Sequence, residues 1–256
     1  MEIKNKTALV TGATSGIGKE IALCLGEYGY NVCVHYHSKK EMAEKVCEEI
    51  RKNVVKAECY YADIRELDDI KAMFTKIYDD FKVLDILVNN AGSSDEVYFL
   101  DATEEMFDKI LKTDFKSVYF CSQYAAKIMI KNNTHGVIVN ISSNQVEGCW
   151  PRATIYAPAK AAVSKFTKNT AMELIPHNIR MVAVAPGYTN VGWAEDDHRM
   201  DAAKRLPMRR FASTREIAEG VIYLVGENAG YITGTTLTID GGATLPVTAA
   251  NDFEVE

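Results

Sequence analysis

Thr11-Gly12-Ala13-Thr14-Ser15-Gly16-Ile17-Gly18 is the stretch of sequence that decides the fold, because it follows an apolar run and opens a segment of helical period. Glycines at this spacing allow a tight turn and a close approach of the backbone to a pyrophosphate. Free N–H groups and the positive dipole end at the start of the following helix attract the same anion. The stretch therefore predicts a dinucleotide site formed by Gly12, Thr14, Ser15, Gly16, Ile17 and Gly18.

Short and mostly continuous apolar runs alternate with amphipathic segments from end to end. Continuous apolar strands are typical of a parallel sheet that is buried on both faces. The expected strands are Thr7–Thr11, Asn31–Tyr36, Val54–Tyr61, Leu84–Asn89, Gly136–Ile141, Arg180–Ala185 and Thr235–Ile239. The expected helices are Gly18–Tyr28, Glu41–Lys52, Leu67–Phe81, Lys116–Lys131, Ala159–Leu174 and Thr214–Val225. We predict an α/β fold, a single domain over residues 1–256 with a three-layer α/β/α sandwich around about seven parallel strands.

Composition excludes several classes of function. The 256 residues are 47% hydrophobic and 25% charged, with a formal net charge of −6, so no basic surplus indicates a nucleic-acid partner. The six cysteines lack metal-ligand spacing, and no apolar stretch reaches the ~20 residues that span a bilayer. The N-terminus lacks the apolar core of a signal peptide. We expect a cytoplasmic protein that holds no metal and binds neither nucleic acid nor membrane.

Two segments depart from the alternation of strands and helices. Residues 188–211 follow a Pro-Gly turn without any predicted strand, and a connection of this length is expected to be a substrate-binding lid. Residues 246–256 form a polar tail that is expected either to be disordered or to dock on a neighbouring subunit.

The end of the second predicted strand bears on the choice of dinucleotide. An NAD-specific site usually places an Asp or Glu here, but this chain has Tyr36, His37, Ser38 and Lys39. Ser38 and Lys39, together with His37, could hold a 2′-phosphate, which favours NADP, whereas NAD stays open if the lysine merely begins a solvated helix. Beyond the third strand, Asp63 and Ile64 are candidates to contact adenine, or Asp63 is a simple turn residue.

Three side chains carry the candidate chemistry. Ser143 follows the fifth predicted strand, and Tyr156 and Lys160 are four residues apart, so they share one face of a helix. An ordinary phenol keeps its proton at neutral pH, but a nearby ammonium stabilises the phenolate. Tyr156 can then take a proton from an alcohol or give one to a carbonyl, while Ser143 holds the substrate oxygen. The pattern indicates an oxidoreductase that transfers a hydride.

In this set and order the motifs resemble the classical subgroup of the short-chain dehydrogenase/reductase family, over about Lys6 to Thr244. The matching pieces are TGATSGIG, Asp63, the NNAG of residues 89–92, Ser143, Tyr156-x-x-x-Lys160 and Pro186-Gly187. The resemblance implies a Rossmann fold and the interconversion of a secondary alcohol and a ketone with NADP, which we favour, or NAD. A catalytically idle dinucleotide-sensing regulator is the alternative, but its hallmark would be loss of Tyr156 or Lys160.

The resemblance also implies roles for individual residues. Tyr156 would be the acid/base, Lys160 would bind the nicotinamide ribose, and Ser143 would orient the substrate. The remaining cofactor contacts would come from Asn90, Ala91, Gly92, Pro186, Gly187 and Thr189. Family members assemble mostly as dimers or tetramers, and we expect a homotetramer built on the helices that carry residues 114 and 156. The outer apolar surface of those helices would come from Tyr119, Phe120, Tyr124, Val163, Phe166 and Met172.

Two positions depart from the family pattern. Asp114 stands where the family usually has an Asn that holds a water in a proton relay to the Lys. An ionised Asp accepts hydrogen bonds but donates none, so we expect catalysis with an altered pH profile. Val191 stands where the family often has a Thr, and Thr189 is the nearest hydroxyl that could replace it.

The substrate is less constrained than the reaction, because a fold does not determine its ligand. Local similarity is greatest to glucose 1-dehydrogenase-like members, which favours a sugar or polyol. Gln145, Glu147, Trp150 and His198 would then line a polar pocket with an aromatic wall. A 3-oxoacyl thioester and a steroid or bile acid are the alternatives, and for a sterol the apolar wall would come from Trp193, Met200 and Met208.

Overall fold

The computed structural model describes residues 6–93, 95–194 and 197–245. The predicted tail, residues 246–256, lies outside the described residues, as do two residues of the predicted lid, 195 and 196. Whether the tail is disordered or docks on a neighbour therefore stays a prediction.

Seven parallel strands form one central sheet in the order β3-β2-β1-β4-β5-β6-β9. They are β1 (Thr7–Val10), β2 (Asn31–Tyr36), β3 (Ala57–Tyr61), β4 (Ile86–Asn89), β5 (Val137–Ile141), β6 (Arg180–Pro186) and β9 (Thr236–Ile239). Along β1, Ala8 and Val10 belong to one core cluster and Leu9 to the other, which explains why the strand is apolar at every position. The predicted fold class is confirmed.

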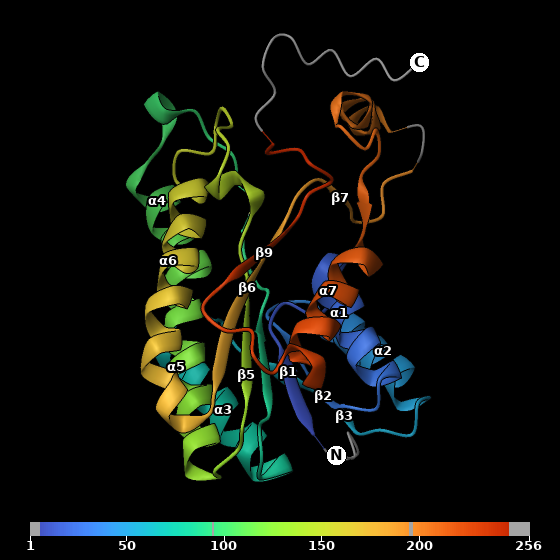
Figure 1. Cartoon of the computed structure of the whole chain (residues 1–256), viewed down its shortest axis with the longest axis vertical. Coiled ribbons are helices and arrows are strands. Elements are labelled where there is room, and N and C mark those ends of the chain that lie inside the picture. Colours follow the sequence, from blue (N-terminus) through green and yellow to red (C-terminus); the bar gives the residue numbers. More distant parts are fainter. Residues whose placement is uncertain (1–5, 94, 195–196, 246–256) are drawn as a thin grey trace.

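Helices cover both faces of the sheet (Figure 1). On one face lie α1 (Gly16–Glu27), α2 (Lys40–Arg51) and α7 (Thr214–Val225), and on the other lie α3 (Leu67–Phe81), α5 (Ser117–Lys131) and α6 (Tyr156–Leu174). The unpredicted elements before α5 include α4 (Glu104–Leu111) and a π-helical segment, Lys112–Lys116, that joins it to α5. A π-segment inserts an extra residue into a helical turn, so it changes which side chain faces the core.

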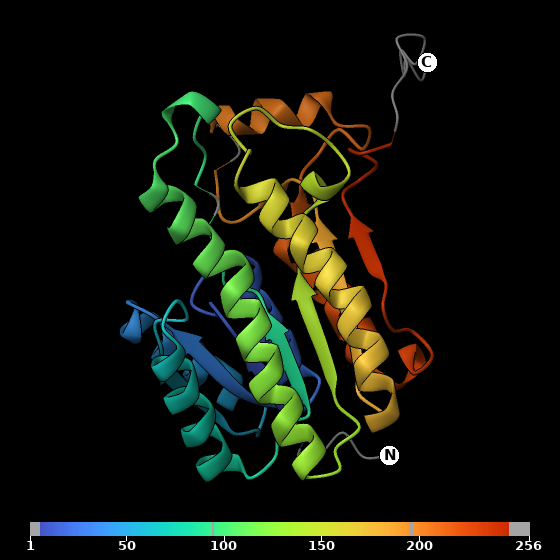
Figure 2. The same ribbon diagram turned by 90° about the vertical axis from the view of Figure 1, so that its left-hand side faces the viewer.

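The predicted lid contains more regular structure than its sequence suggested. We expected no strand between residues 188 and 211, but β7 (Thr189–Asn190) pairs in parallel with β8 (Ala212–Ser213). A 3-10 helix, His198–Arg205, lies between them at the same end of the molecule as the N-terminus of α6 (Figures 1 and 2). The short β7–β8 pair ties the two ends of the segment together.

Helices α5 and α6 lie side by side at the front of Figure 2, and their outer face carries part of the expected apolar surface. Tyr119 and Met172 are 43% and 70% exposed. Val163 is fully buried, which contradicts its expected place on this face, because its side of α6 packs on the sheet. Phe120, Tyr124 and Phe166 are only partly buried. None of the helices in the described part of the chain has the length and apolar character needed to cross a membrane.

Candidate functional site

The carboxyl ends of the strands open onto a cavity of about 830 Å³ beside the turn from β1 to α1. It lies where the strand order reverses, between β1 and β4, which is where open parallel sheets bind their ligands. The structure brings together here the predicted dinucleotide-contacting residues Gly12, Thr14, Ser15, Gly16, Ile17, Gly18, Tyr36, His37, Ser38, Asp63, Ile64, Asn90, Ala91 and Gly92.

The glycine turn is fixed by close contacts with the loop after β4. Gly12 has φ +64°, and a Cβ there would lie 2.9 Å from Ala91 Cα, so the turn requires glycine. Asn90 Nδ2 donates to the carbonyl oxygens of Thr11 and Gly12 at 2.9 and 3.1 Å. Helix α1 then begins with no side-chain cap and no acidic residue in its first turn. Its first N–H groups stay available for an anion, so these residues fit a dinucleotide diphosphate.

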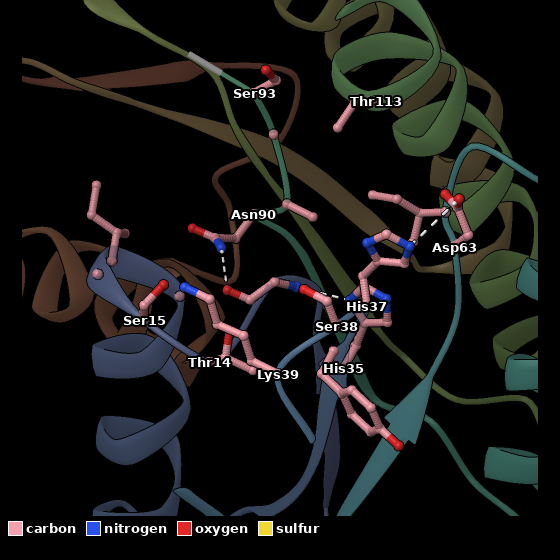
Figure 3. A pocket seen from close by; sticks show the side chains of 18 of the residues that line it. Thr14, Ser15, His35, His37, Ser38, Lys39, Asp63, Asn90, Ser93 and Thr113 are labelled. Carbon is pink, nitrogen blue, oxygen red and sulfur yellow. Dashed lines mark hydrogen bonds and ion pairs between the residues drawn. The ribbon is translucent and has the colours of Figure 1, made fainter. Parts of the chain in front are cut away.

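His35 supports this turn from beneath (Figure 3). The Gly12 N–H donates to His35 Nδ1 at 2.9 Å, and His35 Nε2 lies 3.0 Å from the Ala62 carbonyl oxygen. Both contacts are satisfied only by a neutral ring that carries its proton on Nε2. Burial lowers the pKa of His35 to about 4, which keeps the ring neutral. The sequence predicted no role for His35. The one feature that could have pointed to it was a polar residue within an otherwise apolar strand.

Charged side chains gather where β2 and β3 end. The Asp63 carboxylate accepts hydrogen bonds from Arg65 Nε at 2.8 Å and from the Arg65 backbone N–H at 3.0 Å. His37 Nε2 lies 3.6 Å from Asp63 Oδ2 (Figure 3). The hydrogen bonds from Arg65 lower the pKa of Asp63 to about 2, so Asp63 is ionised. The sequence predicted no role for Arg65, although its place two residues after the predicted site residue Asp63 could have indicated that it belongs to the same site.

A second cavity, of about 370 Å³, adjoins the first and shares Ile17, Asn90, Gly92, Ser93 and Val191 with it. It collects the remaining predicted site residues: Asp114, Ser143, Gln145, Trp150, Tyr156, Lys160, Pro186, Gly187, Thr189 and Trp193. The two cavities together form one continuous path from the glycine turn to the predicted reacting groups.

The two serines after β5 are used differently. Ser142 is buried behind α6, with its Oγ 2.8 Å from Ser164 Oγ and 3.1 Å from the Lys160 carbonyl oxygen. Ser143 Oγ accepts a hydrogen bond from the Gln145 N–H at 3.2 Å. That bond leaves the Ser143 hydroxyl proton free to be donated into the cavity.

Tyr156 is the first residue of α6, and the Lys160 ammonium lies one turn further on. Lys160 Nζ is 5.6 Å from the centre of the Tyr156 ring and donates to the Ile141 carbonyl oxygen at 3.0 Å. It also lies 3.2 Å from Oδ1 of Asp114, which is fully buried. The Ser93 N–H donates to Asp114 Oδ2 at 3.0 Å. Burial raises the pKa of Asp114, and the charge of Lys160 opposes that rise.

Aromatic side chains form one wall of the second cavity. Trp150 Nε1 donates to the Tyr188 hydroxyl at 2.8 Å, and Tyr188 stacks on Phe211 with ring centres 5.5 Å apart. Trp193 packs edge-on against Phe211 at 5.8 Å. Sequence reasoning missed Tyr188, whose role depends on the folded path of the lid. Other predicted pocket residues do not line this cavity in the part of the chain that the structure describes: Glu147, His198, Met200 and Met208.

Comparison with known proteins gives matches over almost the whole chain. A family model described as enoyl-(acyl carrier protein) reductase matches residues 12–244. Oxidoreductase YohF of Escherichia coli is 37% identical over 94% of this chain and 96% of its own length. The 3-oxoacyl-[acyl-carrier-protein] reductase FabG of Staphylococcus aureus is 38% identical over 93% and 97%. Glucose 1-dehydrogenase 2 of Bacillus subtilis is 33% identical over 95% and 96%.

Solved structures give the same result. Acetoin dehydrogenase YohF from Salmonella typhimurium superposes with a TM-score of 0.90 and 34% identity, over 96% of this chain and 99% of that chain. The angucycline C-6 ketoreductase LanV, solved with bound NADP, has a TM-score of 0.88 and 31% identity, over 95% and 97%.

The buried ring of His35 predicts that stability depends on pH. The unfolded chain binds a proton at His35 near pH 6.5, whereas the folded protein resists it down to about pH 4. The contribution of His35 to stability is therefore complete above pH 6.5 and is lost as the pH falls toward 4, by up to about 3 kcal/mol. Urea unfolding of His35→Gln between pH 7.5 and 4 should show a correspondingly smaller acid loss.

The matched control is His177→Gln, since His177 is exposed in a 3-10 turn and should not change the acid loss. An acid loss in His35→Gln equal to that of the wild type would show that His35 is not its source.

Proposed function

This chain belongs to the short-chain dehydrogenase/reductase family, and we propose on that premise that Tyr156, Ser143 and Lys160 carry its reaction. It is an oxidoreductase that interconverts an alcohol and a ketone with a nicotinamide dinucleotide. The observation that supports these three residues is their convergence, with Asp114, on one small cavity that adjoins the dinucleotide-sized cavity.

Tyr156 exchanges the proton in this proposal. When bound, a nicotinamide dinucleotide would supply the hydride to the carbonyl carbon of a ketone or accept it from the carbon of an alcohol. In reduction the Tyr156 hydroxyl gives its proton to the substrate oxygen, and in oxidation the phenolate takes that proton back. Ser143 donates a hydrogen bond to the same oxygen and so holds it beside Tyr156.

Lys160 has a double task. Its ammonium lies 5.6 Å from the centre of the Tyr156 ring and places a positive charge beside the phenol. Its hydrogen bond to the Ile141 carbonyl uses one of its three N–H donors, and Asp114 Oδ1 lies 3.2 Å from Nζ as an ion pair. The rest of its hydrogen-bonding capacity is available for a ribose hydroxyl. Asp114 acts on Tyr156 only through Lys160, so it is a positioning residue.

We propose NADP as the preferred dinucleotide. The end of β2 offers Ser38 and Lys39 instead of a carboxylate, so a 2′-phosphate meets no repulsion there. LanV, which is similar over nearly the whole chain, was solved with NADP.

We propose a small substrate with a hydroxyl next to the reacting carbon, a class that includes sugars, polyols and hydroxyketones. The cavity of about 370 Å³ favours a small molecule. Gln145 Oε1 is shielded from solvent, and no group in the described residues donates to it. A buried acceptor without a donor is costly, and a substrate hydroxyl would satisfy it. A relative solved as an acetoin dehydrogenase supports the same class.

The test is a turnover screen by nicotinamide absorbance with NADP(H) and NAD(H). Substrates are vicinal diols and hydroxyketones, sugars, acetoacetyl thioesters and steroids. Tyr156→Phe should lower kcat by at least about a hundredfold, because it removes the exchangeable proton, with cofactor affinity unchanged. Gln145→Leu should raise KM for the diols and leave simple alcohols unaffected.

Thioester turnover alone would favour the second candidate, a 3-oxoacyl thioester reductase like FabG. Cofactor binding without turnover on any substrate would favour the dinucleotide-sensing alternative.

Asp114 should set the pH profile. Asp114→Asn removes a buried negative charge 3.2 Å from Lys160 Nζ, so the surroundings of Tyr156 become more positive. The phenolate is then favoured, and the acid limb of kcat/KM for alcohol oxidation should move down by about one pH unit. Asp108→Asn is the control, because Asp108 forms an exposed ion pair with Lys112. Superposable profiles for Asp114→Asn and the wild type would reject this role.

We also propose a cytoplasmic homotetramer joined through the outer face of α5 and α6. A groove of about 600 Å³ between the two helices, lined by Phe115, Tyr119 and Phe166, supports this interface. Light scattering should give four times the chain mass of 28.4 kDa, and Tyr119→Glu should reduce that mass by adding charge to the groove. A single-chain mass for the wild type at micromolar concentration would contradict the proposal.

A further inference from the structure

Arg65 lies beside the segment that follows β2, in the larger cavity. Strands β2 and β3 are parallel neighbours with Tyr36 opposite Tyr61, so the loops that follow them leave the sheet side by side. The cavity wall at this end is formed by His37, Ser38, Lys39, Asp63 and Arg65.

Asp63 holds the Arg65 guanidinium, and two further contacts fix the Arg65 backbone. Its Nε and Nη2 donate to Asp63 Oδ1 and Oδ2 at 2.8 and 2.5 Å, and its backbone N–H donates to Oδ1 at 3.0 Å. From the π-helical segment, Lys116 Nζ donates to the Arg65 carbonyl at 2.9 Å. A fork fixed in this way loses little conformational freedom when it binds a ligand.

The Arg65 guanidinium has hydrogen-bond donors that Asp63 does not use. A guanidinium carries five N–H groups, and Asp63 occupies only those of Nε and part of Nη2. Within the described ranges, no acceptor pairs with Nη1, and the Arg65 side chain is 37% exposed. Arg65 can therefore keep its bond to Asp63 and still donate to a second anion.

The charges of the cavity favour an anion at this end. The other acidic side chain that lines the cavity, Asp95, is paired with Lys109 at 2.6 Å. Lys39 has no ion-pair partner among the residues described, and His37 adds a second basic group. Asp63 is thus the one carboxylate beside Arg65, Lys39 and His37, so the two permanent cations leave a net positive charge that attracts a phosphate group.

We propose that Arg65, oriented by Asp63, binds the 2′-phosphate of NADP(H) and is a determinant of the preference over NAD(H). This inference rests on the proposed function and names the residue that selects the cofactor. In it, Asp63 serves as the counter-ion that aims the guanidinium.

The experiment measures binding and not turnover. The full-length protein is titrated with NADPH and NADH by fluorescence, and with 2′,5′-ADP and 5′-AMP by calorimetry. In Arg65→Gln the Kd of NADPH and of 2′,5′-ADP should rise about tenfold or more, as expected for a lost charged hydrogen bond. The Kd of NADH and of 5′-AMP should stay within about twofold of the wild type.

Lys109→Gln is the matched control, since it removes one positive charge from the same cavity wall at the Asp95 pair. It should leave the ratio of the NADPH and NADH dissociation constants unchanged. Arg65→Lys keeps the charge without the fork, and should weaken NADPH binding by an intermediate factor.

Equal weakening of NADPH and NADH in Arg65→Gln would overturn the inference, because it would indicate an adenine contact or a structural role. Unchanged binding of both would overturn it too. If Arg65→Gln does not fold, the inference is tested with Arg65→Lys and with the ratio of the 2′,5′-ADP and 5′-AMP affinities of the wild type. A ratio near one rejects the 2′-phosphate site. Wild-type protein that binds neither dinucleotide would instead reject the proposed function itself.

Discussion

Parallel hydrogen bonding between the strands is the constraint on which the rest of the molecule depends. Because all seven strands run the same way, every chemistry-bearing loop leaves the sheet at one edge. The register of the strands places their carboxyl ends at the same height in the sheet, with Val10 opposite both Val34 and Val88, and Asn89 opposite Asn140. The reversal of strand order between β1 and β4 then separates the loops enough to leave the larger cavity.

Buried polar groups hold this edge in place. Asn89 Nδ2 donates to Asn140 Oδ1 at 2.8 Å, and Asn140 Nδ2 donates to Thr167 Oγ1 at 2.9 Å, which joins β4, β5 and α6. His35 joins the glycine turn to the end of β3 in the same manner. Each of these groups would be costly if left without its partner, so the backbone has few alternative positions. The site is therefore specified by polar contacts set in an apolar core.

Local signals account for what was predictable from the sequence. Continuous apolar runs and the spacing of Gly12, Gly16 and Gly18 depend on near neighbours, so the seven strands, the layers and most of the motif residues that line the cavities were anticipated. Three features depend on contacts that no local pattern encodes. The π-segment turns Asp114 into the core, the β7–β8 pair fixes the lid, and Tyr188 meets Trp150 across 38 positions of sequence. Val163 was misplaced because helical period does not show which of two faces meets the sheet.

Two ion pairs of similar composition stand at opposite ends of the path, and their surroundings give them different consequences. The Asp114–Lys160 pair is almost wholly buried, with side chains 0% and 4% exposed, so solvent screens its field on Tyr156 very little. The side chains of the Asp63–Arg65 pair are 17% and 37% exposed, so water and salt weaken the electrostatic field of this pair. What Arg65 then offers a ligand is mainly its directed N–H donors. Removing one charge therefore acts through electrostatics at the reacting end and through lost hydrogen bonds at the adenosine end. In our proposals, the same pairing of an Asp with a basic side chain therefore acts on proton transfer in one place and on cofactor recognition in the other.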